Sequence, residues 1–270
     1  MIASLSVALA LAGNVQTDPI SPVSRWMLRS DPALCRLERQ NTEPPVTLSI
    51  DTTPGSDVYR VAIASRTVKG SASLVPAALT FAPSLITLNG RASVATVPNG
   101  IPVIWMQGVA PEFLDQLASA DRVTIATNKG VGGSVAVVGT AEAVKAFRSC
   151  NAEQLIDWGA DAGQFAPGGT IPVAIQNRDA WLSHKELLAL AMQSRQSNID
   201  VVFRVAISVE GTVDDCRAVT DDIDKKSEKI ACSAVVNKPL FTAAKDPGGR
   251  SVRGVATFRV VLERRPSRQY

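Results

Sequence analysis

The sequence predicts an α+β protein with two domains, and three observations lead to this prediction. The chain has 270 residues, which is enough for two hydrophobic cores of usual size. Helical and strand-like hydrophobic patterns follow one another along it. Both patterns fade between residues 159 and 181, where glycine and proline accumulate as in a linker. We expect a leader at 1–17, an α+β domain at 18–160, a linker at 161–179 and a second domain at 180–265.

The first domain begins with strand patterns and ends with a helix. "VTLSI" and "DVYRVAIAS" flank the turn-rich "DTTPGSD", as in two strands joined by a loop. "IPVIWMQGV" predicts a further strand, and Pro111 suits the first position of the short helix after it. Two more strands enclose the glycine-rich loop at 128–134. The next helix can be capped by Thr140 and ended by Gly159.

The second domain shows the order helix, strand, strand, helix, strand. Ser183 and Glu186 form a capping-box pattern, which predicts a helix over about 184–195. Alternating apolar residues from Val201 to Val209 predict a strand that turns back at Gly211. A second helix pattern covers "DIDKKSEKIACSAVV", and "SVRGVATFRVVLERR" predicts the last strand. We therefore expect a three-stranded antiparallel sheet with two helices.

The N-terminus is typical of a secretory signal peptide. No charged residue precedes Asp18, and Ala8, Ala10 and Ala12 offer A-x-A cleavage frames. The Lys or Arg that usually opens a signal peptide is missing. Two alternatives are an uncleaved membrane anchor and a buried strand of a cytosolic protein. With cleavage, the protein would be exported, and we expect it in the periplasm.

The four cysteines indicate disulfides more than a metal or redox site. There is no C-x-x-C pair and only one histidine, His184, which speaks against structural zinc and thioredoxin-like chemistry. An even number of cysteines in an exported protein favours bridges. Of the three possible pairings, one keeps each bridge within a predicted domain. It joins Cys35 to Cys150 and Cys216 to Cys232.

No pattern in the sequence predicts a catalytic, cofactor or metal site. His184 lies beside a predicted cap, as a solvated surface residue would, and there is no G-x-S-x-G or S-x-x-K motif. The acidic residues at 214–215 and 221–224 lack the spacing of a calcium loop and suit strand ends and helix caps. Lys and Arg are spread along the chain at a net charge of +3, which does not favour nucleic-acid binding.

Residues 180–263 resemble the C-terminal domain of the TonB energy-transducer family. The resemblance rests on Gly211 in the hairpin, on "F-x-x-A" at 241–244 before Asp246, and on "G-x-x-V" at 249–252. It implies a periplasmic domain that binds a peptide of an outer-membrane receptor by adding a strand at a sheet edge. TonB transducers also have a membrane helix and a long Pro-rich spacer. Here a folded domain follows a short leader, so the resemblance implies the fold more than energy transduction.

The first domain shows one short similarity. "RWMLRSDPALCRLERQ", with Trp26 nine residues before Cys35, is similar to the invasion-associated locus B family of exported proteins. The similarity covers this segment alone and implies no site residue.

The sequence favours a non-enzymatic envelope protein that binds a protein or peptide, and the resemblance to TonB implies a link to outer-membrane transport. The alternative is an envelope enzyme or enzyme inhibitor with a site between the domains. A three-stranded sheet leaves an edge unpaired, and the last strand is long and rich in β-branched residues. We expect this edge to bind an envelope protein, a peptide or a second copy of the chain. Alternatively, the charged residues on this strand serve only to protect the edge against aggregation. The edge residues are Arg253, Val255, Thr257 and Arg259.

Overall fold

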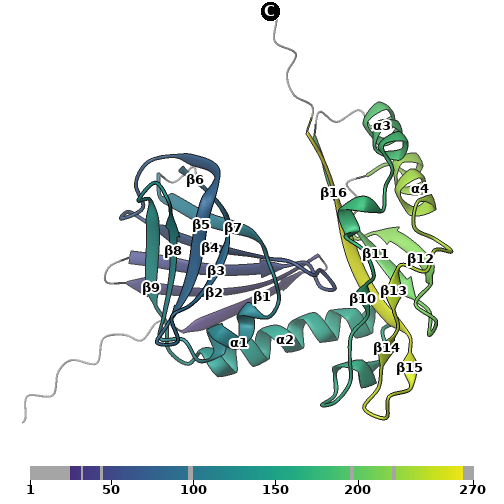
Figure 1. Cartoon of the computed structure of the whole chain (residues 1–270), viewed down its shortest axis with the longest axis horizontal. Coiled ribbons are helices and arrows are strands. Elements are labelled where there is room, and N and C mark those ends of the chain that lie inside the picture. Colours follow the sequence, from purple (N-terminus) through teal and green to yellow (C-terminus); the bar gives the residue numbers. More distant parts are fainter. Residues whose placement is uncertain are drawn as a thin grey trace, which may run out of the picture.

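The computed structural model describes residues 25–31, 33–42, 45–96, 100–194, 198–220 and 223–263. The leader predicted at residues 1–17 lies outside these residues. Figure 1 shows two folded parts, a larger one coloured purple to teal and a smaller one coloured green to yellow. We call residues 25–160 the N-terminal domain and residues 161–263 the C-terminal domain.

The predicted α+β class is wrong, because the molecule is mostly β, with 47% strand and few helices. Its main element is a nine-stranded sheet, and four strands of that sheet, within residues 26–42 and 72–96, were not predicted. In the second of these stretches the alternation of apolar and polar residues is weak. Leu74 has a φ of +48° where the strand register shifts, and Pro76 follows within the same strand. The partner strand has mostly exposed residues.

The nine strands pair in the order β1-β2-β3-β4-β7-β6-β5-β8-β9, and every pair is antiparallel. Their bounds are β1 (Trp26–Asp31), β2 (Leu34–Thr42), β3 (Pro45–Thr52), β4 (Tyr59–Ser65), β5 (Ala72–Ala82), β6 (Ile86–Thr96), β7 (Pro102–Val109), β8 (Arg122–Thr127) and β9 (Gly132–Ala136). The glycine-rich stretch at 128–134 contains the hairpin loop that joins β8 to β9, as predicted, and its last three residues belong to β9.

The sheet curls so far that β9 lies close to β3 and β4 (Figure 1). Side chains of the first two strands bond to the backbone at the end of β9. Arg39 Nη1 and Trp26 Nε1 donate to the carbonyl of Val138 at 2.6 and 2.9 Å, and Asn41 Nδ2 donates to the carbonyl of Ala136 at 3.1 Å. These bonds cover backbone groups that an open sheet edge would expose.

Two helices close one end of the curled sheet. They are α1 (Phe113–Ala118) and α2 (Thr140–Asp157). Phe113 and Phe147 are almost fully buried, in one core with the inward side chains of the strands. The Cys35–Cys150 disulfide joins β2 to α2. In Figure 1, α2 runs from beneath the sheet to the C-terminal domain.

The C-terminal domain contains a three-stranded antiparallel sheet in the order β12-β11-β16. Two helices cover the sheet face that points away from the N-terminal domain (Figure 1). Phe203 and Phe258 stack at 5.1 Å in the core between helices and sheet. The bounds are α3 (His184–Gln193), β11 (Asn198–Ile207), β12 (Val213–Ala218), α4 (Lys225–Ser233) and β16 (Gly254–Glu263).

The predicted helix starts can be compared with the observed caps. Ser183 and Glu186 form the capping box of α3, as predicted. The second helix begins later than predicted, because the Asp224 side chain accepts from the N–H groups of Lys226 and Ser227 and so fixes the N-cap. The Cys216–Cys232 disulfide ties α4 to β12. Both bridges thus follow the expected pairing.

The stretch predicted as a linker is structured. It contains η1 (Ala162–Phe165) and β10 (Val173–Ala174), and η2 (Arg178–Ala180) begins at its end. β10 pairs with β13 (Phe241–Thr242), and β14 (Ala244–Lys245) pairs with β15 (Ser251–Val252). Several residues between η1 and η2 face the N-terminal domain and line the cleft that is described below.

Candidate functional site

The four residues predicted as a partner-binding edge lie on or just before β16, which is an edge strand of its sheet. Their surroundings differ. Val255 and Thr257 are 3% and 2% exposed, whereas Arg253 and Arg259 are exposed. The burial of the middle pair comes from the N-terminal domain, so this part of the edge is occupied within the molecule itself.

The loop between β3 and β4 binds to β16 at Thr257. The N–H of Thr257 donates to the carbonyl of Gly55 at 3.1 Å, and its hydroxyl donates to the carbonyl of Pro54, also at 3.1 Å. Gly55 has a φ of +80°, and a Cβ atom there would lie 3.0 Å from the Cα of Ala256. The positive φ favours glycine at this position, and the close approach of the two backbones leaves little room for a side chain.

Arg178, at the start of η2, fastens the same contact from the other side. Its Nη1 donates to the carbonyls of Gly55, at 2.8 Å, and of Thr257. Its Nε lies 3.0 Å from Asp57 Oδ2 without the angle of a hydrogen bond, so this contact is an ion pair. The guanidinium also lies over the Phe241 ring at 5.7 Å. Burial lowers the pKa of Arg178, while Asp57 opposes this effect.

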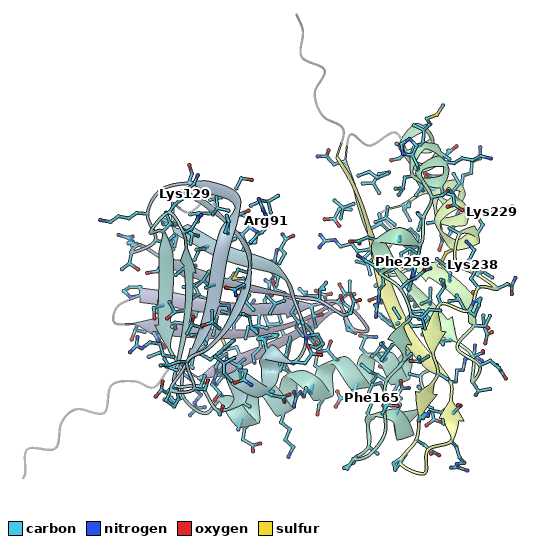
Figure 2. All side chains as sticks on the ribbon, viewed as in Figure 1. Arg91, Lys129, Phe165, Lys229, Lys238 and Phe258 are labelled. Carbon is cyan, nitrogen blue, oxygen red and sulfur yellow. A yellow bond between two sulfur atoms is a disulfide. The ribbon has the colours of Figure 1, made fainter. Side chains whose placement is uncertain are left out.

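A small apolar core joins the domains below this contact. It consists of Leu155 from the end of α2, Ala160, and Val255 of β16, with Trp158 and Phe165 packed against it. Figure 2 shows Phe165 just beyond the end of α2, at the foot of the C-terminal domain.

Further polar contacts reach the lower end of β16. The Arg253 carbonyl accepts from the N–H of Asp161 at 2.9 Å and from Gln164 Nε2 at 3.3 Å. The Arg253 side chain lies 3.8 Å from Asp214. The lower end is thus bonded to η1 and its cap.

The C-terminal part of β16, from Arg259 to Glu263, has a different environment, and we call it the upper end of the strand. The Arg259 side chain forms a two-pronged ion pair with Asp200 of the neighbouring strand. In an antiparallel strand, alternate residues direct their backbone groups to the same side. Since the N–H of Thr257 points away from β11, those of Arg259 and Val261 do so too. Neither N–H has a backbone partner among the residues that the structure describes.

A cleft of about 1130 Å³ lies between the two domains. Its walls come from the β3–β4 loop, α1, α2, the residues from η1 to η2, and β16. Tyr59 lines it and packs edge-on against Phe113 and Phe147, at 5.4 and 5.9 Å. Burial raises the pKa of Tyr59 to about 12, so its hydroxyl keeps its proton at neutral pH.

The other polar residues considered from the sequence do not meet in this cleft. His184 is the first residue of α3, on the far side of the C-terminal sheet (Figure 1). Asp215 pairs with Arg217 at 3.0 Å on β12, and Asp224 caps α4. Asp221 and Asp222 lie outside the described residues. Over the described part of the chain, no three His, Cys, Asp or Glu side chains are grouped to hold a metal ion.

No protein-family model, curated protein or solved structure matches this chain. Among the described residues, no helix is long and apolar enough to span a bilayer. The two disulfides are typical of exported proteins, because thiols stay reduced in the cytosol.

Sequence reasoning missed Gly55 and Arg178, the two residues that hold β16 to the N-terminal domain. In the sequence Gly55 is one residue of a turn-rich loop, and its need for glycine comes from a strand about 200 residues later. The one available signal is Arg178 itself, a charged residue three positions before Trp181 at the end of an apolar stretch.

Proposed function

We propose that this chain is a periplasmic envelope protein that binds an extended segment of another envelope protein by strand addition. The observation that carries the proposal is the upper end of β16, from Arg259 to Glu263, whose outward backbone groups have no partner among the described residues. An unpaired edge of this kind binds extended peptides through main-chain hydrogen bonds. The resemblance of residues 180–263 to TonB C-terminal domains supports the same mode of binding.

The binding edge is shorter than the sequence led us to expect. Val255 and Thr257 already contact the N-terminal domain, so the proposed site consists of Arg259, Val261 and Glu263. Val261 is 51% exposed, and it offers an apolar contact beside the free N–H. The Arg259–Asp200 ion pair holds the side chain of Arg259 on the sheet face and away from the edge bonds.

The proposed role is binding and not catalysis. Two carboxylates line the cleft, Asp57 and Glu112, and Asp57 is paired with Arg178. The Tyr59 phenol, which also lines the cleft, keeps its proton at neutral pH. Among the described residues that line the cleft, no nucleophilic side chain is hydrogen-bonded to a side chain that could act as its base.

The test compares Val261→Pro with Val261→Ala, each carrying a photo-reactive aromatic residue in place of Arg259. Proline removes the outward N–H, and alanine keeps it. In irradiated cells we expect a cross-linked partner with the alanine variant and a loss of at least about tenfold with the proline variant, the factor that corresponds to about 1.4 kcal/mol. Circular dichroism checks that both variants are folded.

Mass spectrometry then identifies the cross-linked chain. Equal cross-linking by the folded proline and alanine variants would remove strand addition at Val261 from consideration. An adduct made only of two copies of this chain would also overturn the proposal, because the bound strand would then come from self-association.

A further inference from the structure

One wall of the cleft between the domains is unusually apolar for an exposed surface. It is the extended stretch from Thr170 to Asn177, in which every second side chain is a branched aliphatic one. Ile171, Val173 and Ile175 are 53%, 58% and 60% exposed. Ile171 and Val173 line the cleft, whereas Ile175 does not. Exposed aliphatic residues gathered in a hollow indicate an interaction site more than the same residues scattered singly.

The floor of the cleft is apolar as well, and its shape is fixed. Leu114, Val144 and Leu155 lie in the lining and are almost fully buried. The walls belong to different domains, but Arg178 and Thr257 bond them together across the β3–β4 loop. A ligand would therefore meet a preformed apolar hollow, and hollows of about 300–1,000 Å³ hold drug-sized molecules.

Two cations of α2 also line the cleft. Lys145 and Arg148 are exposed, lie three residues apart, and both line the cleft. Arg148 pairs with Asp115 at 2.6 Å, while Lys145 has no carboxylate partner among the described residues. Two carboxylates also line the cleft. Asp57 is bound to Arg178, and Glu112 is the other.

We propose that this cleft binds a single-chain lipid with an anionic head group. The acyl chain lies against Ile171 and Val173 over the floor made by Leu155, and the head group is placed at Lys145. Of the three cations in the lining, Arg148 and Arg178 already have carboxylate partners, so Lys145 is the cation that can bind an anionic head group. This site is separate from the edge of β16 and does not depend on the function proposed for that edge.

The apolar wall is tested by binding of a dansyl-labelled fatty acid and its displacement by decanoate. Val173→Asp places a charge against the acyl chain, and we expect it to weaken decanoate binding at least tenfold. Ile175→Asp is the matched control, because it puts the same charge two residues along the same exposed row, outside the lining. We expect it to change the affinity less than twofold. Equal losses in the two variants, or displacement unchanged by Val173→Asp, would overturn the proposal.

The head group is tested with Lys145→Gln and the matched surface control Lys229→Gln on α4, labelled in Figure 2. Lys145→Gln is expected to weaken decanoate binding three- to tenfold and to leave decanol binding unchanged, while Lys229→Gln changes neither. Decanol bound as tightly as decanoate by the unmodified protein would contradict the anionic head group. A lack of saturable binding of decanoate would contradict the site as a whole.

Discussion

At the scale of single residues, Gly55 is a point where the N-terminal domain packs against the backbone of β16. Its φ of +80° is accessible to glycine and strained for other residues. The space is restricted too, since an added Cβ would lie 3.0 Å from the Ala256 Cα and 3.0 Å from the Leu155 Cδ2. Strain and crowding are two separate effects, and a suitable control separates them.

We predict that Gly55→Ala lowers the free energy of unfolding by about 2–4 kcal/mol, from backbone strain of about 1–2 kcal/mol and from overpacking against β16. Gly249→Ala is the control, because Gly249 has a φ of +79° and no atom within 4 Å of the added Cβ. It should lose only the strain part, about 1–2 kcal/mol. Urea titrations followed by circular dichroism measure both values. Equal losses in the two variants would show that crowding of Gly55 against β16 does not contribute to the free energy of unfolding.

Arg178 illustrates what a local reading of sequence leaves out. Its hydrogen-bond acceptors are 123 residues earlier and 79 residues later in the chain. Hydrophobic periodicity reports which side of an element is buried and gives no information on the partner of a single polar group. A buried guanidinium is stable only with such partners, so its place can be understood only from the folded chain.

At the scale of elements, the two disulfides close loops of very different length. Cys35 and Cys150 are 115 residues apart and connect β2 to α2, whereas Cys216 and Cys232 are 16 residues apart and connect β12 to α4. A bridge that closes a longer loop restricts the unfolded chain more.

We predict that replacing Cys35 and Cys150 by alanine lowers the free energy of unfolding by about 5 kcal/mol, and that the same replacement of Cys216 and Cys232 lowers it by about 3 kcal/mol. Urea titrations of the two double variants give the values, and the reduced wild-type protein should be less stable than either. A larger loss for the short loop would contradict an origin in chain entropy.

The sequence predicted elements well where their signals are local. The capping box at Ser183 and the hairpin at Gly211 each depend on neighbours within a few residues. The cap predicted at Thr140 is wrong, because Gly139 is the N-cap of α2 and the Thr140 hydroxyl donates to the carbonyls of Ala118 and Ala120. The strands β1, β2, β5 and β6 were missed. β5 and β6 have small, proline-containing or mostly exposed sequences. They are held by pairing with both of their neighbours in the sheet, β5 with β6 and β8 and β6 also with β7, and not by their own pattern.

At the scale of the whole molecule, the sequence of the C-terminal domain alone does not predict which part of the β16 edge is covered. The sequence correctly shows a long strand rich in β-branched residues, and such a strand at an edge requires a partner or protection. It does not show that the other domain covers Val255 and Thr257. Which part of an edge stays open depends on how domains pack, and this is decided by contacts such as Thr257 to Gly55.

The position of α2 has a thermodynamic consequence. Phe147 in its middle belongs to the core of the N-terminal domain, and Leu155 near its end belongs to the small core shared with Val255 of β16. Melting of either domain would remove packing from the other, so we predict that the molecule melts as one cooperative unit. Scanning calorimetry should show a single heat-absorption peak, with a calorimetric enthalpy equal to the van't Hoff enthalpy. Two resolved peaks would mean that the domains unfold independently and that α2 does not couple their stabilities.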